Sequence, residues 1–167
     1  TRGDDLYILV DPGNYSVTYQ LLGYENHLSP DDHFQNLMRL IQAVAGRAHR
    51  ISVIMPSLYG GRQHRRVSRE SLDCAFALQQ LRDVGVKNII TFDAHDPRVM
   101  NAVPTMSFDN VMPTYQVLKC LLHHVPDVSF HKDNFMIVSP DEGAMNRNMY
   151  YSSVLGCNLG MFYKRRD

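Results

Sequence analysis

The 167-residue sequence lacks several features that would place it in a specialised class of protein. No apolar run approaches the roughly 18–20 residues of a membrane-spanning helix, so we expect no membrane segment. Seventeen basic and seventeen acidic residues cancel, which argues against a general binder of polyanions such as nucleic acid. The cysteines Cys74, Cys120 and Cys157 form no C-x-x-C motif and are odd in number. We therefore expect reduced thiols and a cytoplasmic location.

The two ends of the sequence also lack expected features. There is no initiator Met and no signal peptide, and the first residues lead directly into an apolar run. The last four residues, 164–167, follow directly after another apolar run. Natural chains rarely begin and end beside buried strands. We therefore interpret the sequence as a piece of a longer protein.

The sequence does contain a regular series of short apolar runs. With 44% hydrophobic and 20% charged residues, it can form a globular core. Four runs have the length and continuous hydrophobicity of buried parallel strands, and a fifth run is a weaker candidate. These predicted strands are residues 6–10, 51–55, 88–92, 135–138 and 159–163.

Helical patterns separate most of these runs. In the first of them, apolar residues from Phe34 to Ala45 recur at the spacing of one helix face. Ser68 is the expected N-cap of the second helix. Pro113 is expected to begin the third helix, which would bury its apolar residues between Leu118 and Val125. A fourth, less regular helix is expected after Asp141. The first three predicted helices cover residues 34–46, 68–85 and 113–125.

The alternation of strands and helices predicts an α/β fold with a parallel sheet flanked by helices. We expect a first domain at residues 1–110, with its beginning missing, and the truncated start of a second at 111–167. The break is expected where Asp109-Asn110 interrupts the pattern before a new helix.

Ligands of an open parallel sheet bind beyond the carboxyl ends of its strands. The predicted strand at 51–55 is followed by Gly60-Gly61-Arg62-Gln63-His64-Arg65-Arg66, with Arg69 close behind. Glycines let the backbone approach a ligand, and guanidinium groups suit phosphate. The alternatives are a solvated basic loop or a nucleic-acid patch. The absence of aromatic residues between the arginines weakens the second alternative.

Acidic residues follow two later strands. Asp93-Ala94-His95-Asp96 comes after the run at 88–92, and Asp141 comes after the run at 135–138. These residues could hold Mg²⁺ with nucleotide phosphates, although imidazole is an unusual magnesium ligand. They could instead be helix caps beside a structural histidine. The final Lys164-Arg165-Arg166 could bind a charged transition state or form a polar tail.

In this order, the motifs resemble those of ribose-phosphate pyrophosphokinase, a family also called phosphoribosyl pyrophosphate synthetase. The resemblance covers nearly the whole chain, and four ordered motifs on a suitable framework are improbable by chance. It implies two domains, each like a type I phosphoribosyltransferase, in a cytoplasmic homo-oligomer that is commonly a hexamer. The matching segments are Tyr-Gly-Gly-Arg-Gln-His-Arg-Arg at 59–66, Phe-Asp-Ala-His at 92–95, Val-Ser-Pro-Asp at 138–141 and Lys-Arg-Arg at 164–166.

The resemblance also implies an activity and a set of roles. The family transfers the β,γ-diphosphoryl group of ATP to the C1 hydroxyl of ribose 5-phosphate, giving phosphoribosyl pyrophosphate and AMP with Mg²⁺ as cofactor. Residue by residue, it implies ATP binding for Arg62, Gln63 and, beside them, Arg65, magnesium association for His95 and Asp141, and catalysis for Lys164 and Arg166.

Two segments depart from the common family pattern. His64 stands where Asp usually follows the Arg-Gln pair, and Asp96-Pro97-Arg98 stands where Ala-Asp-Gln is common. We interpret these changes as a divergent branch rather than as lost function. The family's acidic ribose 5-phosphate loop would lie beyond residue 167, so we expect this polypeptide alone to be a poor enzyme.

Two other interpretations compete with a diphosphotransferase. One is a non-catalytic relative or fragment that binds nucleotide or associates with active subunits. The other is a nucleic-acid-binding domain that uses residues 62–69, which predicts steep salt dependence. Zero net charge and the acidic residues at strand ends count against it.

Overall fold

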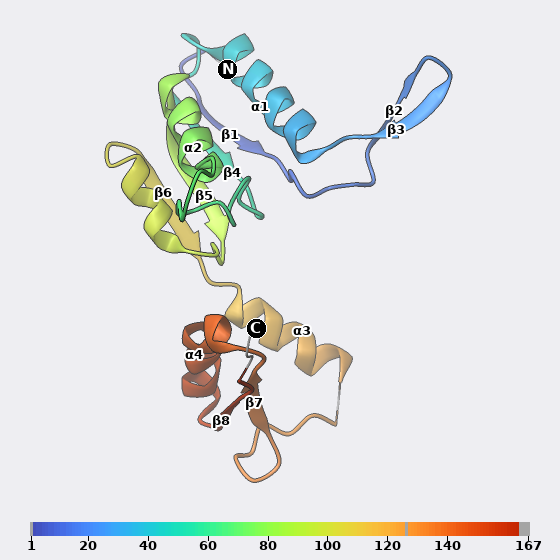
Figure 1. Ribbon diagram of the computed structural model, residues 1–167, viewed down its shortest axis with the longest axis vertical. Helices are drawn as coiled ribbons and strands as arrows, with labels where there is room; N and C mark the ends of the chain where they lie inside the picture. The colour runs from blue at the N-terminus through green and yellow to red at the C-terminus, as the bar shows by residue number, and fades with distance from the viewer. Residues whose placement is uncertain (1, 126, 164–167) are drawn as a thin grey trace. The chain divides into compact units, whose positions relative to one another are not determined.

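The computed structural model describes residues 2–125 and 127–163 of the chain. The chain divides into two compact units, unit 1 at Thr1–Met112 and unit 2 at Pro113–Asp167 (Figure 1). Within the described ranges, none of the helices has the length and hydrophobicity needed to cross a membrane.

Unit 1 is built around a four-stranded sheet in which every neighbouring pair of strands is parallel. Its strand order is β1-β4-β5-β6, so each new strand is added beside the previous one. Because crossovers between parallel strands are right-handed, this order places the connecting helices on one face. The elements are β1 (Asp5–Leu9), α1 (Pro30–Val44), β4 (Arg50–Ile54), α2 (Asp73–Asp83), β5 (Val86–Phe92), the 3₁₀ helix η1 (Pro97–Ala102) and β6 (Ser107–Val111).

Helix α1 begins at a capping box. The hydroxyl of Ser29 accepts a hydrogen bond from the Asp32 N–H at 3.2 Å, and the Asp32 carboxylate accepts one from the Ser29 N–H at 2.9 Å. This exchange satisfies two backbone donors that the first turn leaves without helical partners. The apolar stripe predicted for this helix is confirmed, and its buried members are Phe34, Leu37, Met38 and Ile41.

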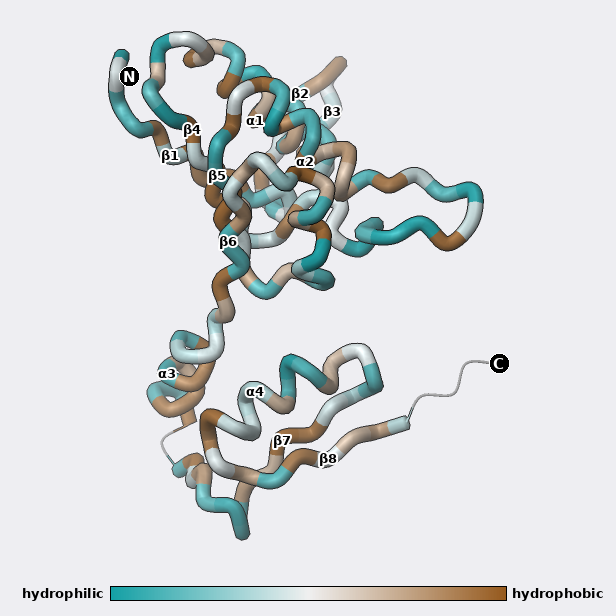
Figure 2. Tube along the Cα trace, turned by 90° about the vertical axis from the view of Figure 1, so that its left-hand side faces the viewer, coloured by the Kyte–Doolittle hydropathy of each residue, from teal (hydrophilic) through white to brown (hydrophobic). Residues whose placement is uncertain are grey.

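The hydrophobic core of unit 1 lies between the sheet and these helices. Ile8, Val53 and Ile89 are neighbours in the register and are 9%, 0% and 0% exposed. Burying a side chain of this size contributes about 1.5–3 kcal/mol to folding. On the other face of the same sheet, Tyr7 and Leu9 are 56% and 70% exposed. Figure 2 shows the apolar residues concentrated in β4 and β5.

A β-hairpin that the sequence did not predict precedes α1. Strands β2 (Thr18–Leu21) and β3 (Tyr24–His27) are antiparallel, and the hairpin projects from unit 1 (Figure 1). Its turn has positive φ at both Leu22 (51°) and Gly23 (82°). Such turns usually carry Asn-Gly or Asp-Gly, so Leu-Gly gave no turn signal.

Unit 2 contains a parallel pair of strands and two α-helices, of which the second packs against the strands. Strands β7 and β8 pair in register from Met136 with Asn158 to Ser139 with Met161. Among the described residues of this unit, only Thr114, Ser139 and Cys157 are buried. The elements are α3 (Thr114–His124), β7 (Met136–Ser139), the 3₁₀ helix η2 (Glu142–Ala144), α4 (Met145–Leu155) and β8 (Asn158–Met161).

The predicted α/β fold with a parallel sheet flanked by helices is confirmed. All five predicted strands form, with ends displaced by one or two residues, and a helix follows Asp141 as expected. The third helix begins at Thr114, one residue after Pro113, which takes the N-cap position.

Three local predictions were wrong. Ser68 does not cap a helix, because α2 begins only at Asp73, after a loop that folds back on its first turn. Asp109-Asn110 does not interrupt the pattern but lies within β6, where the outermost strand tolerates polar side chains. Residues 118–125 do not form a buried face, since Leu122 is 52% exposed and nothing within the described part of unit 2 covers it.

Candidate functional site

The loop after β4 carries the glycine pair and the arginines. Gly60 has a φ of +65°, a left-handed conformation that favours glycine. A Cβ atom at this position would lie 3.1 Å from the backbone nitrogen of Cys74. The N–H of Cys74 also donates to the backbone carbonyl of Gln63 at 3.4 Å. The glycine therefore lets the loop pack on the first turn of α2, and this packing places Gln63.

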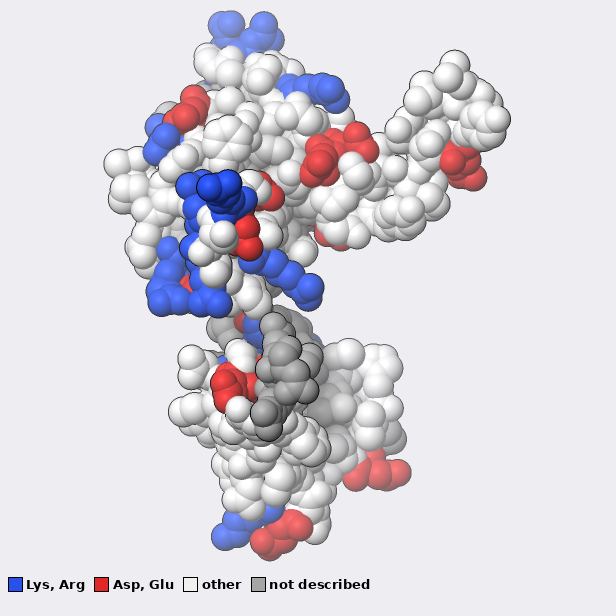
Figure 3. Space-filling model, viewed as in Figure 1, with Lys and Arg blue, Asp and Glu red and all other residues white. Residues whose placement is uncertain are grey.

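The basic residues of this loop lie at the surface of unit 1. Figure 3 shows Lys and Arg side chains gathered over the segment between β4 and α2. In residues 2–125 and 127–163, no acidic side chain forms an ion pair with these guanidinium groups. The groups are thus available to an anion. The exposed side chains are Arg62, Gln63, Arg65, Arg66 and Arg69, which include the three residues assigned to ATP.

The loop after β5 is held by the neighbouring strand β6. Asp93 has a φ of 47°, which is uncommon for a residue with a side chain. Its N–H donates to the Val111 carbonyl at 3.0 Å, and the Ala94 N–H donates to Oδ1 of Asn110 at 2.8 Å. These bonds fix the backbone just before His95, whose side chain is exposed. Sequence reasoning missed Asn110 because it gave no signal beyond polarity.

The two loops meet at His64. Its Nε2 atom lies 3.6 Å from Oδ2 of Asp96, and the side chains of both residues are only 13% exposed. The rings of His64 and His95 have centroids 5.0 Å apart. Arg98 donates from Nε to both oxygens of Asp96 at 2.9 and 3.1 Å, and this lowers the pKa of the Asp96 carboxyl well below its usual range. The carboxylate is therefore charged at neutral pH.

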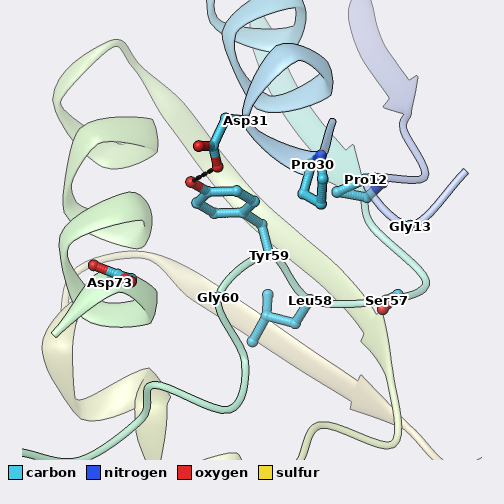
Figure 4. Close-up of a pocket in the computed structure, with 9 residues that line it drawn as sticks. All are labelled: Pro12, Gly13, Pro30, Asp31, Ser57, Leu58, Tyr59, Gly60 and Asp73. Carbon is cyan, nitrogen blue, oxygen red and sulfur yellow. Dashed lines mark hydrogen bonds between the residues drawn. The ribbon is translucent and has the colours of Figure 1, made fainter. Parts of the chain in front are cut away.

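A pocket of about 320 Å³ lies beyond the carboxyl ends of β1 and β4 (Figure 4). The Tyr59 hydroxyl donates to Oδ1 of Asp31 at 2.7 Å, and this hydrogen bond raises the pKa of Tyr59 to about 12. The ring of Tyr59 also stacks on Phe34, with centroids 4.5 Å apart. Asp73 lines the same pocket. The two carboxylates, Asp31 and Asp73, make this pocket a poor site for a phosphate group.

In unit 2, Asp141 follows β7 as predicted. Its Oδ1 atom accepts from the Ala144 N–H at 3.1 Å, so it caps the short helix η2. The buried Ser139 hydroxyl donates to the Asp141 carbonyl at 2.8 Å and fixes the turn. The cap interpretation is confirmed, while a magnesium role for Asp141 stays a prediction. The catalytic candidates Lys164 and Arg166 lie outside the described residues.

Across the part of the chain that the structure describes, no three His, Cys, Asp or Glu side chains are arranged to hold a metal ion. His95 and Asp141 belong to different units. Neither unit therefore forms a complete metal site from its own described side chains, and a metal ion would need ligands from a bound nucleotide or water.

Sequence comparison decides the family. A sequence profile of the N-terminal domain of ribose phosphate pyrophosphokinase matches residues 1–85, about half of the chain. The chain belongs to the ribose phosphate pyrophosphokinase family. The family predicted from the four motifs is thereby confirmed.

Curated members of the ribose phosphate pyrophosphokinase family match over most of the chain. The enzyme of Agrobacterium fabrum is 27% identical over 141 residues, which are 82% of this chain and 43% of the relative. The enzyme of Maricaulis maris is 25% identical over 169 residues, with 99% and 47% covered. The chain thus spans less than half the length of these curated relatives.

A solved structure supports the fold. Phosphoribosylpyrophosphate synthetase from Mycobacterium smegmatis matches with a TM-score of 0.78 and 22% sequence identity. The match covers 99% of this chain and 50% of that protein. Both units therefore have the backbone fold of a ribose phosphate pyrophosphokinase, as the motifs predicted.

Proposed function

We propose that the chain is part of a ribose-phosphate diphosphokinase and carries its ATP-binding loop. The observation that supports this most is the set of exposed guanidinium groups at 62–69, which form no ion pair within residues 2–125 and 127–163. They lie beside the His95 loop at the carboxyl edge of the sheet. Ligands of parallel sheets bind at this edge. Family membership supplies the reaction, which transfers the diphosphoryl group of ATP to ribose 5-phosphate.

The loop residues fit a binding and orienting role in this reaction. The C1 hydroxyl oxygen of ribose 5-phosphate attacks the β-phosphorus and loses its proton, while the bond from that phosphorus to the α,β-bridging oxygen breaks and AMP leaves. Arg62 and Arg65 present planar donor groups that suit phosphate oxygens, and Gln63 adds an amide. Holding the triphosphate in line with the attacking hydroxyl accounts for much of the catalysis in phosphoryl transfer.

Magnesium is the proposed cofactor, and Asp141 is a more suitable ligand for it than His95. Oδ2 of Asp141 is not used by the helix cap and is the kind of oxygen ligand that Mg²⁺ prefers. The imidazole of His95 suits a hydrogen bond to a phosphate oxygen better than it suits Mg²⁺. The ion, when bound to the nucleotide, would neutralise phosphate charge. Catalytic roles for Lys164 and Arg166 are part of the same proposal.

The family resemblance also supports proposals for the assembly, the location and the binding partners of the protein. We propose a homo-oligomer in the cytoplasm that uses ATP and ribose 5-phosphate and binds neither nucleic acid nor membrane. The zero net charge of the chain is the observation on the molecule itself that speaks against nucleic acid.

Calorimetric titration of the chain with ATP tests the proposal. We expect binding that Arg62→Ala weakens by roughly 10- to 150-fold, since a charge-assisted hydrogen bond contributes about 1.5–3 kcal/mol. Arg82→Ala is the matched control, because Arg82 lies in the last turn of α2 and pairs with Asp83. Equal losses in the two variants, or no binding by the wild-type chain, would contradict an ATP site at this loop.

The diphosphokinase reaction needs a separate assay. A protein that continues the chain beyond residue 167 should release AMP from ATP only when ribose 5-phosphate is present. ATP binding without AMP release would favour the non-catalytic interpretation. Binding of RNA that competes with ATP and falls steeply with salt would favour the nucleic-acid interpretation.

A further inference from the structure

The two segments that depart from the family pattern contact each other in the folded chain. His64 comes from the loop after β4, and Asp96 comes from the loop after β5. Nε2 of His64 lies 3.6 Å from Oδ2 of Asp96. Neither side chain is at the open surface, because each is only 13% exposed.

We propose that the His64–Asp96 bridge clamps the nucleotide loop, residues 59–66, against the His95 loop, residues 93–96. His64 is thereby a positioning residue: it sets where Arg62 and Gln63 lie without itself contacting the nucleotide. This inference rests on the proposed function, because the clamp has a functional meaning only if the loop binds ATP.

The Asp96 side of the bridge is held by contacts within its own loop. Asp96 caps η1 by accepting from the Arg98 N–H at 2.9 Å, and the Arg98 guanidinium holds both carboxylate oxygens. A carboxylate fixed by its own helix cannot follow a moving partner. His64 is therefore held by an anchor that belongs to the His95 loop.

The His64 side of the bridge is equally confined. The residue before it, Gln63, has its carbonyl bonded to the first turn of α2, and Gly60 packs on the same turn. The ring of His64 lies against His95, tilted by 59°. Its other nitrogen, Nδ1, is buried and has no hydrogen-bond partner among the described residues. Among the described residues, Asp96 thus supplies the polar contact of the His64 ring and His95 its ring contact.

A double-mutant cycle on ATP affinity separates this clamp from simple electrostatics. The variants are His64→Gln, Asp96→Asn and the two combined, with ATP titrated in the presence of excess magnesium chloride. Asp96→Asn removes a negative charge beside the nucleotide loop, so electrostatics alone predicts tighter binding. The clamp predicts weaker binding, about fivefold for each single variant, and no further loss in the double variant.

A matched control comes from a second His–Asp pair, at the opposite edge of the same sheet. Nδ1 of His49 lies 3.0 Å from Oδ1 of Asp5, where β1 and β4 begin rather than end. His49→Gln and Asp5→Asn should leave the ATP affinity unchanged. Urea unfolding of every variant gives the readout for a purely structural role, and Asp96→Ser, which keeps a capping side chain, replaces Asp96→Asn if that variant does not fold.

The outcomes separate the two proposals. If the wild-type chain binds ATP and Asp96→Asn tightens binding, or the single effects multiply in the double variant, the clamp is overturned and the ATP site stands. A shift in urea midpoint with an unchanged dissociation constant also overturns the positioning role. If the wild-type chain binds no ATP, the proposed function fails and the clamp loses its purpose.

Discussion

Both units contain a parallel strand–helix–strand motif, but the helix has a buried face in unit 1 and none in unit 2. In unit 1, the parallel strands β4 and β5 are joined by α2; in unit 2, the parallel strands β7 and β8 are joined by α4. Helix α2 buries Cys74, Ala77, Leu78 and Leu81, whereas α4 buries none of its residues. The same path of the backbone therefore supports a core in one unit and little burial in the other.

The difference comes from the number of strands and from the helix sequence. Strands β4 and β5 lie inside a four-stranded sheet, while β7 and β8 form a two-stranded one. A helix that packs on a four-stranded sheet can contact apolar side chains from several strands. A two-stranded pair offers fewer such contacts and has only marginal stability by itself. Helix α4 also places polar residues all round, from Asn146 to Ser153. The local sequence pattern is therefore enough to form the helix and the strands, whereas a buried core also needs a sheet of more strands.

Deleting buried atoms in α2 should have the largest effect. Leu78 is 1% exposed, so Leu78→Ala should destabilise unit 1 by about 3 kcal/mol through lost burial and a cavity. Val154 of α4 is 53% exposed, and Val154→Ala should change stability by less than about 0.5 kcal/mol. Urea unfolding followed by circular dichroism measures both. Similar losses would remove the contrast between the units.

Two glycines with the same backbone conformation give a closer comparison. Gly60 and Gly156 have φ values of +65° and +64°, but only Gly60 is crowded, by the backbone of Asp73 and Cys74. Gly156→Ala should lose about 1 kcal/mol from conformational strain alone. Gly60→Ala should lose about 1–2 kcal/mol more and weaken ATP binding, because the loop must move away from α2. Thermal unfolding and ATP titration are the measurements, and equal losses would show that the loop can yield.

Thiol labelling of the native chain compares local opening in the two units. Cys120 is exposed and should be alkylated first. Cys157 and Cys74 are both buried, at 9% and 0% exposure, but Cys74 lies within the larger core, where burial raises the pKa of its thiol to about 11. We expect Cys157 to react about tenfold faster than Cys74, because opening of unit 2 is less costly. Mass spectrometry of quenched samples measures the rates; faster labelling of Cys74 would reverse the ranking.

The smallest predicted effect concerns Tyr59 at high pH. Its pKa is raised to about 12 by the hydrogen bond to Asp31, so Asp31→Asn should lower it towards the ordinary value of 10.0. The folded state then holds its phenolic proton where the unfolded state loses it. This contribution to stability is complete below about pH 10 and is lost as the pH rises towards 12. NMR of ¹³C-labelled tyrosine follows the titration, and an unchanged Tyr59 in the variant would rule out this hydrogen bond as the cause.

Much of unit 1 could be predicted because its signals are local. Continuous apolar runs predicted β4 and β5, and the apolar stripe predicted α1. Strand β6 was missed because Asp109 and Asn110 are polar, which an outermost strand tolerates. The apolar face of α3 was predicted as buried because sequence spacing shows which residues share a face, not what covers that face.

In the candidate site, too, the strand that each of its loops follows could be predicted, but the contacts between different loops could not. The order of the motifs indicated that Arg62, Gln63 and His95 follow neighbouring strands, and the structure places them on adjoining loops. The contact of His64 with Asp96 could not be predicted, because it depends on how far each loop folds back over the sheet. Asn110 was missed for a related reason: its amide acts on a loop from the preceding strand.

The strand order of unit 1 has a consequence for how the protein is made. Each later strand of the four-stranded sheet, β4, β5 and β6, pairs with the strand of the same sheet that was synthesised before it. Assembly can therefore proceed in the order of synthesis, without waiting for distant segments to return. The polar strand β6 is added last, and its Asn110 then accepts the hydrogen bond from the N–H of Ala94, next to His95. The part of the candidate site that lies in unit 1 is thus completed in the final step of building this sheet.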